Sequence, residues 1–199
     1  MNLQTPKKFK MMVSQAHDVA VNVLRPISRK YDKAEHAYPK ELDMIASLID
    51  GMNEGGDGIN AGAAGASKRG DENREGIRNG TNMSTALGII EMCYGDTGLL
   101  LSMPRQGLGN SAIAAVANDE QLKRFKGIWA AMAITEPNCG SDSAAIRTTA
   151  VKDGDHYILN GEKIYVTSGA RADAVVVWAT LDRKLGRAAI KSFVVPKGT

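Results

Sequence analysis

The sequence predicts an α+β protein, with an N-terminal α-helical domain followed by an antiparallel β-domain. Three observations predict this class. Apolar residues recur at helical spacing up to about residue 127, and short β-branched apolar runs separated by turn residues follow from residue 128. Strands and helices do not alternate, which argues against a parallel α/β fold. We therefore expect two domains, residues 1–127 and residues 128–199.

The composition is that of an ordinary globular chain. Of 199 residues, 43% are hydrophobic and 24% charged, with a net charge of +3. The mild charge and 5% aromatic content give no reason to expect a nucleic-acid partner. Cys93 and Cys139 lie far apart and the three histidines lack ligand spacing, so we expect no disulfide framework and no metal site. The lack of a disulfide framework favours a reducing, cytoplasmic compartment. Apolar runs shorter than the ~20 residues of a membrane span predict that the chain has no such span.

The first helices are expected from apolar periodicity and from prolines. Apolar residues between Phe9 and Leu24 form one stripe, and Pro26 is expected to kink or end that helix. A second helix is expected to start at Pro39, a good first-turn residue, and to end at Gly51.

A glycine-rich segment interrupts the helical half. Residues 51–80 contain nine glycines and many charges, which predicts a long flexible loop. Further helices are expected at about 83–94, at 110–117 and from Asn118, since Asn118 and Gln121 have the spacing of a capping box. We therefore expect four or five helices in residues 1–127.

Turn residues divide the second half into short strands. Residues 153–155 form one turn, and Asn160-Gly161 is the dipeptide typical of a tight hairpin. The pattern predicts an antiparallel meander. The expected strands are 128–135, 146–152, 156–159, 162–168, 172–180 and 189–195.

One glycine motif invites a dinucleotide-binding interpretation. Gly107-x-Gly109-x-x-Ala112 fits Gly-x-Gly-x-x-Ala, but Pro104 interrupts any preceding strand and no acidic residue lies ~20 positions further on. Close packing of a helix through small residues is the favoured interpretation.

The most informative segment is residues 132–143, where an apolar strand ends in a polar turn. Pro137 restricts φ, Gly140 lets a ligand approach the backbone, and the following N–H groups with the Ser141 hydroxyl can bind an anion. On the residues alone, a plain turn with local hydrogen bonds is favoured over a phosphate site, and both remain open.

The same turn resembles a known family. Thr135-Glu136-Pro137-Asn138-Cys139-Gly140-Ser141-Asp142 is similar to the Thr-Glu-Pro-x-x-Gly-Ser-Asp signature of acyl-CoA dehydrogenases. Residues 160–169, Asn-Gly-Glu-Lys-Ile-Tyr-Val-Thr-Ser-Gly, resemble the family's Asn-Gly-x-Lys-x-aromatic-Ile/Val-Thr-Asn/Ser-Gly segment. The resemblance covers about residues 83–195 and is weaker over 1–50. It implies the family's N-terminal helical domain and most of its β-domain, with the C-terminal helical domain absent from this chain.

The resemblance implies an FAD-dependent acyl-CoA dehydrogenase of fatty acid metabolism, an oxidoreductase that passes a hydride to flavin N5. It implies that Thr135 contacts the pyrimidine side, that Ser141 holds pyrophosphate or the thioester substrate, that Tyr165 packs against the isoalloxazine and that Thr167 donates to N5. The implied cofactor-binding residues are Met132, Ala133, Ile134, Thr135, Gly140, Ser141, Tyr165, Val166 and Thr167.

Each role has a plainer alternative. Tyr165 and Thr167 share one face of the expected strand, and are then ordinary core and edge residues. Glu136 looks like a general base, but in the family it belongs to the turn, so no catalytic residue is assigned in this chain.

The resemblance also bears on the whole protein. The family keeps its catalytic carboxylate in the C-terminal helical domain, which implies a fragment that is inactive alone. The alternative is a non-catalytic truncated subunit, or a flavin and acyl-CoA binding module, paired with a full-length partner. Oxidase or hydroxylase chemistry also stays open. An electron-transfer flavoprotein as electron acceptor and a homo- or hetero-tetramer are further implied, whereas acyl chain length and branching are not.

Overall fold

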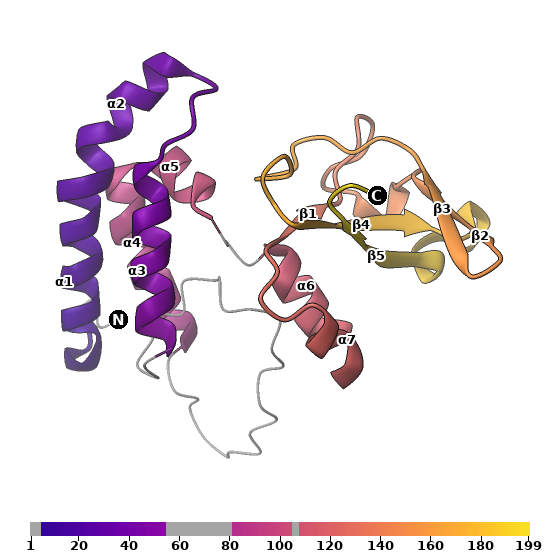
Figure 1. The fold of residues 1–199 in the computed structure, drawn as a ribbon, viewed down its shortest axis with the longest axis horizontal. Coiled ribbons are helices and arrows are strands. Elements are labelled where there is room, and N and C mark those ends of the chain that lie inside the picture. Colours follow the sequence, from indigo (N-terminus) through magenta and orange to yellow (C-terminus); the bar gives the residue numbers. More distant parts are fainter. Residues whose placement is uncertain (1–4, 55–80, 105–107) are drawn as a thin grey trace. The chain divides into compact units, whose positions relative to one another are not determined.

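The computed structural model of the protein describes residues 5–54, 81–104 and 108–199. They form two compact units (Figure 1), one of helices up to α5 and one that contains α6, α7 and the β-sheet. The α+β class is therefore confirmed. The flexible loop expected over residues 51–80 lies outside the described residues from 55 onward.

The helical unit begins with a 3-10 turn at Lys7–Phe9 and continues in one long helical run. Within the described ranges, none of the helices is both long and apolar enough to cross a membrane. The elements of this unit are α1 (Lys10–Val19), a π-helical turn (Ala20–Leu24), α2 (Arg25–Ala34), α3 (Glu41–Glu54), α4 (Thr81–Gly95) and α5 (Thr97–Ser102).

Two expected helix ends are wrong. Of the two outcomes expected at Pro26, a kink or an end, the end does not occur, although proline lacks an N–H and its ring blocks the carbonyl four residues earlier. The π-helical turn absorbs this conflict, because the Arg25 N–H donates to the Ala20 carbonyl five residues back. Likewise α3 continues past Gly51 to Glu54, since one glycine inside a helix costs only ~1 kcal/mol.

Among the residues that the structure describes, one apolar cluster holds the helical unit together. Leu24 and Leu42 are its fully buried members, and Ile45, Met92 and Leu99 pack with them. Helix α5 is not among the helices expected from the sequence. Its signal is local, since the side chain of Asp96 at the N-cap accepts from the Leu99 N–H at 2.7 Å.

The second unit is a five-stranded sheet with two helices. Strand β4 pairs with β1, β2 and β5, and β3 pairs with β2 (Figure 1). Short 3-10 segments lie at Ser143–Ala145 and Arg183–Ala189. The other elements are α6 (Leu108–Val116), α7 (Asp119–Arg124), β1 (Ala130–Ala133), β2 (Thr149–Asp153), β3 (His156–Asn160), β4 (Ala174–Thr180) and β5 (Ile190–Pro196).

The sheet is mixed and not the purely antiparallel meander that the turns suggested. The pairs β2–β3 and β4–β5 are antiparallel, whereas β1–β4 is parallel and β2 meets β4 in parallel at Thr149 and Thr180. The reason is the long connection between β1 and β4, which contains the β2–β3 hairpin and returns the chain to the end where β1 began.

The tight hairpin predicted at Asn160-Gly161 does not form. The tight hairpin lies instead between Asp153 and His156, where Gly154 has φ +57°. Residues 161–173 form no strand. A Cβ on Gly161 would lie 2.7 Å from the Thr148 Cα, so this glycine permits a close backbone approach rather than a turn.

Helix α6 packs closely on β1, as the small-residue interpretation expected. A Cβ on Gly109 would lie 2.3 Å from the Ala131 carbonyl oxygen. The buried Asn110 side chain donates to the Ile128 carbonyl at 2.8 Å and accepts from the Ala130 N–H at 2.9 Å. The capping box of Asn118 starting α7 is confirmed.

The boundary between the two compact units differs from the position at which the sequence changes from helical to strand periodicity. They separate near residue 107, because α6 and α7 belong to the unit that contains the sheet. The boundary at 127/128 follows the change from helical to strand periodicity, and as a domain division it stays a prediction.

Candidate functional site at the end of strand β1

The Thr-Glu-Pro turn begins two residues after β1 and is closed by its own backbone. The Glu136 N–H donates to the Cys139 carbonyl at 2.9 Å, and the Cys139 N–H donates to the Glu136 carbonyl at 3.2 Å. Pro137 and Asn138 form the exposed tip. The local hydrogen bonding of a plain turn is thus present, while Gly140 and Ser141 remain exposed beyond it.

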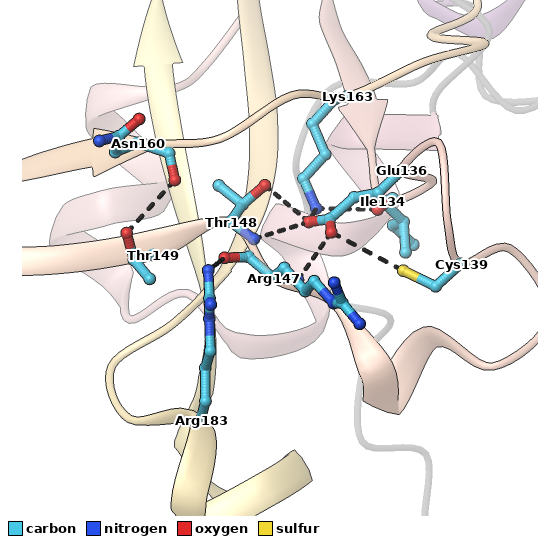
Figure 2. Close-up of polar contacts among 9 residues, drawn as sticks. All are labelled: Ile134, Glu136, Cys139, Arg147, Thr148, Thr149, Asn160, Lys163 and Arg183. Carbon is cyan, nitrogen blue, oxygen red and sulfur yellow. Dashed lines mark hydrogen bonds and ion pairs between the residues drawn. The ribbon is translucent and has the colours of Figure 1, made fainter.

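The second motif lies directly beside this turn. The Ile164 N–H donates to the Thr135 carbonyl at 2.9 Å. The Lys163 ammonium donates to the Ile134 carbonyl at 2.8 Å, as Figure 2 shows. Two segments separated by more than twenty residues therefore meet at the end of β1.

Glu136 lies at the centre of this contact. Its Oε1 accepts from the Lys163 Nζ at 2.8 Å, from the Thr148 Oγ1 at 2.6 Å and from the Thr148 N–H at 2.9 Å. Its Oε2 accepts from the Arg147 N–H at 2.6 Å and lies 3.8 Å from the Cys139 Sγ (Figure 2). The carboxylate is thereby hydrogen-bonded from several directions.

These contacts decide the ionisation of Glu136. Burial raises the pKa of its carboxyl, but hydrogen bonds from Lys163, Thr148 and the Arg147 and Thr148 N–H groups outweigh burial and lower the pKa to about 2. A general base at neutral pH needs a pKa nearer to 7. The geometry therefore agrees with leaving Glu136 out of catalysis.

Sequence reasoning missed the partners of Glu136. Lys163 stands in the quoted Asn-Gly-x-Lys motif and Glu136 in the Thr-Glu-Pro motif, so two opposite charges inside two motifs were the available signal. Their side chains are only 9% and 6% exposed, which a buried pair of opposite charges explains. Thr148 carried no signal of its own.

Tyr165 has an unusual conformation and an unusual exposure. Its φ is +57°, in the left-handed region, and its side chain is 88% exposed. That backbone costs an L residue roughly 1–2 kcal/mol, and such strain concentrates at functional sites. The alternative that Tyr165 and Thr167 are core and edge residues of a strand is wrong, because no strand forms there.

The remaining expected site residues fall into two groups. Met132 and Ala133 belong to β1 and Ile134 follows it, with only Ala133 fully buried. Val166 and Thr167 are half-buried in the second motif. The structure joins Thr135 to the Tyr165 segment, and it leaves Ser141 on the exposed side of the turn.

The comparisons with known proteins point in one direction. Residues 131–199 match the model of the acyl-CoA dehydrogenase middle domain. The chain is 39% identical over 116 residues to the short-chain-specific acyl-CoA dehydrogenase of Clostridium acetobutylicum, a match that covers 55% of this chain and 30% of that protein. It is 32% identical over 187 residues to 3-(aryl)acrylate reductase of Clostridium sporogenes, covering 90% of this chain and 45% of that protein.

A solved structure agrees over the whole chain. Butyryl-CoA dehydrogenase from Megasphaera elsdenii matches with a TM-score of 0.75 and 26% identity, and the match covers 100% of this chain and 51% of that one. The chain thus spans about half or less of the length of the relatives and the solved structure that it matches.

Proposed function

Because the chain belongs to the acyl-CoA dehydrogenase family, we propose that it binds FAD and serves the α,β-dehydrogenation of an acyl-CoA thioester. The observation that carries the proposal is the meeting of two motifs at the end of β1. There the hydrogen bond from the Ile164 N–H to the Thr135 carbonyl joins Thr135 to the segment that carries the exposed ring of Tyr165.

The residues at this place suit a flavin dinucleotide. Tyr165 offers a flat ring that is 88% exposed, and a planar ligand gains apolar contact by covering it. Thr135 and Thr167 are half-buried and carry hydroxyl donors for the polar edge of such a ligand. Gly140 and Ser141 are exposed, so the backbone and a hydroxyl are open to phosphate oxygens.

Each residue has a defined task in this proposal. Tyr165 would cover the isoalloxazine, Thr135 would donate to its pyrimidine side and Thr167 would donate to N5. Ser141 would hold the pyrophosphate or the thioester, and Met132, Ala133, Ile134, Gly140 and Val166 would line the site. When bound, FAD supplies the acceptor for the hydride that leaves the β-carbon of the thioester.

In this proposal the chain's own residues orient the reactants but do not abstract the α-proton of the thioester. With a pKa of about 2, Glu136 is ionised and already accepts several hydrogen bonds, so it does not remove the proton. The proposal assigns that step to a carboxylate outside these 199 residues. On this view the 199 residues are a fragment, or a binding module that works with a full-length partner.

The substrate class is supported by the names of matched proteins. The C. acetobutylicum and M. elsdenii proteins are named for CoA thioesters, whereas the C. sporogenes protein is named as a reductase. Assays should therefore follow both directions of the reaction. An electron-transfer flavoprotein as electron acceptor, a tetrameric assembly and a cytoplasmic location complete the proposal.

A flavin titration with a matched tyrosine control tests the proposal. FAD added to the purified chain should show the shifted absorbance of a bound flavin. Tyr165→Ala should weaken binding by about tenfold, which is the contribution of one covering ring. Tyr157→Ala is the control, because Tyr157 is also exposed, at 46%, but lies on β3 against Phe193. Equal affinities of the two variants, or no binding by the wild type, would contradict the proposal.

A further inference from the structure

The ion pair between Glu136 and Lys163 connects the two motifs rather than a motif and the core. The Nζ–Oε1 distance is 2.8 Å, and the same Nζ donates to the Ile134 carbonyl at 2.8 Å. The next residue, Ile164, donates its N–H to the Thr135 carbonyl. Successive residues of one segment therefore hold successive residues of the other.

A third segment fixes Glu136 from the other side. Thr148 donates to Glu136 through both its N–H and its hydroxyl, and the Arg147 N–H donates as well (Figure 2). Gly161 makes room for this, since a Cβ there would lie 2.4 Å from the Thr148 Oγ1. The carboxylate thus has one position, defined by contacts to residues 147–148 and to Lys163.

The strained backbone of Tyr165 begins directly after these contacts. A φ of +57° persists in a tyrosine only where its surroundings determine it. On its N-terminal side these surroundings are the bonds of Lys163 and Ile164. On its C-terminal side the Gly169 N–H donates to the Val166 carbonyl at 3.1 Å. Tyr165 is therefore held between two sets of bonds.

A contribution to folding stability does not by itself explain why Glu136 and Lys163 form a buried ion pair. A buried ion pair often contributes no more to folding than an apolar pair of the same size, because desolvation offsets the attraction. What an ion pair adds is direction, since each donor and acceptor must meet at hydrogen-bond distance.

We propose that Glu136 and Lys163 are positioning residues, whose buried pair fixes the Thr135 segment and the Tyr165 segment at one separation and orientation. They act on a ligand through Thr135 and Tyr165, without touching it. This inference rests on the proposed function only for the identity of the ligand, FAD. The contacts of Glu136 and Lys163 do not depend on it.

The test uses single variants of the full chain and a matched control. Lys163→Met removes the ammonium and keeps the length of the side chain, while Glu136→Gln keeps the shape and removes the charge. Asp173→Asn is the control, because the Asp173 Oδ2 accepts from the Trp129 N–H at 2.8 Å at the opposite end of β1. FAD affinity and amide exchange of Ile164 are measured beside thermal melting.

We expect both site variants to weaken FAD binding by roughly tenfold, the value of one hydrogen bond to a charged group. Exchange of the Ile164 N–H should accelerate by about the same factor, since its acceptor segment is no longer held. Asp173→Asn should change neither quantity. If the site variants match Asp173→Asn in both, the inference is overturned.

A double variant separates positioning from stability. Lys163→Met alone leaves a buried carboxylate without its cation, so it should melt lower than Glu136→Gln/Lys163→Met. Affinity for FAD should nevertheless stay as weak in the double variant, because Ile134 still lacks its donor. Recovery of affinity together with melting temperature would show a merely structural pair.

The exchange measurement keeps the two proposals distinguishable. If wild-type protein binds no FAD, the proposed function fails, and faster Ile164 exchange in Lys163→Met still supports the positioning role. If wild-type protein binds FAD and the variants bind it equally well with unchanged exchange, the positioning role fails alone.

Discussion

The carboxylate of Glu136 is buried and accepts hydrogen bonds from two other segments of the chain. In the sequence it stands in a polar turn and looks like a general base. In the structure its carboxylate is 6% exposed and bonded to Lys163, Thr148 and the Arg147 N–H. A side chain held in this way is suited to fixing backbone segments, which is why its removal should be visible in stability as well as in binding.

The low pKa of Glu136 predicts an acid-dependent loss of stability. Its pKa is about 2 in the folded chain against an ordinary value of 4.5. The folded pKa is the lower one, so the stabilisation is complete above pH 4.5 and is lost as pH falls towards 2. Glu136→Gln should flatten the fall in unfolding free energy over that range, measured by urea unfolding at several pH values.

The control for this titration is an exposed neighbour. Glu162→Gln removes a carboxylate that lies beside Lys163 in sequence but faces solvent. Its stability should depend on pH as in the wild type. Parallel pH profiles for Glu136→Gln and the wild type would show that the buried carboxylate does not govern acid unfolding.

Thr167 is the residue where binding and folding should separate. Under the proposed function, Thr167→Ala in the complete enzyme should slow flavin reduction by up to roughly 100-fold, because one preorganised donor to N5 would be lost. The cost in stability should be only ~1 kcal/mol, since Thr167 is half-buried outside any strand. Stopped-flow reduction and thermal melting measure the two effects.

Thr149→Ala provides the comparison for Thr167→Ala. The Thr149 hydroxyl donates to the Asn160 carbonyl at 3.3 Å within the β2–β3 hairpin, at the first residue of the second motif and seven residues before Thr167. It should lower stability slightly and leave reduction unchanged. An unchanged reduction rate in Thr167→Ala with a lowered melting temperature would make Thr167 structural.

At the level of elements, glycines decide how closely helices approach their neighbours. Gly109 lies in the first turn of α6 against β1, where a Cβ would lie 2.3 Å from the Ala131 carbonyl oxygen. Gly88 lies inside α4, where a Cβ would lie 3.5 Å from the Met12 Sδ, an ordinary contact. The same chemical change therefore has opposite consequences in two helices.

This contrast yields a prediction with its own control. Gly109→Ala should destabilise the chain by about 2 kcal/mol, because α6 must move away from β1. Gly88→Ala should stabilise it by up to about 1 kcal/mol, because alanine favours the helix over glycine. Chemical unfolding followed by circular dichroism measures both. A neutral Gly109→Ala would mean that the α6–β1 contact yields easily.

At the level of the whole molecule, the prediction concerns activity. The polypeptide of these 199 residues should show no acyl-CoA dehydrogenase turnover. Glu136, the carboxylate beside Thr135, has a pKa of about 2, and the lack of a general base costs roughly 10²–10⁴-fold in rate. A dye-coupled assay with several acyl-CoAs measures this.

The short-chain enzyme of C. acetobutylicum is a suitable positive control for that assay. If the 199-residue polypeptide turned over substrate at a comparable rate, one of its own carboxylates would have to act as the base. Substitution of each acidic residue would then identify it, and the assignment of proton abstraction to residues elsewhere would be wrong.

The sequence by itself determined the elements whose causes are local. Helical spacing predicted the long first helix, the Asn118–Gln121 pair predicted the start of α7, and β-branched runs predicted β4 and β5. The two motifs identified the family. Such signals lie within a few residues of one another, so they need no knowledge of the rest of the chain.

Only the tertiary structure decided which distant residues meet. The parallel pairing of β1 with β4, the ion pair of Glu136 with Lys163 and the left-handed conformation of Tyr165 could not be predicted from local pattern. Asn160-Gly161 shows the reason: its hairpin signal is genuine, but contact with Thr148 overrides it. Contacts between residues far apart in sequence outweigh local preference wherever burial and hydrogen bonding contribute more than a turn does.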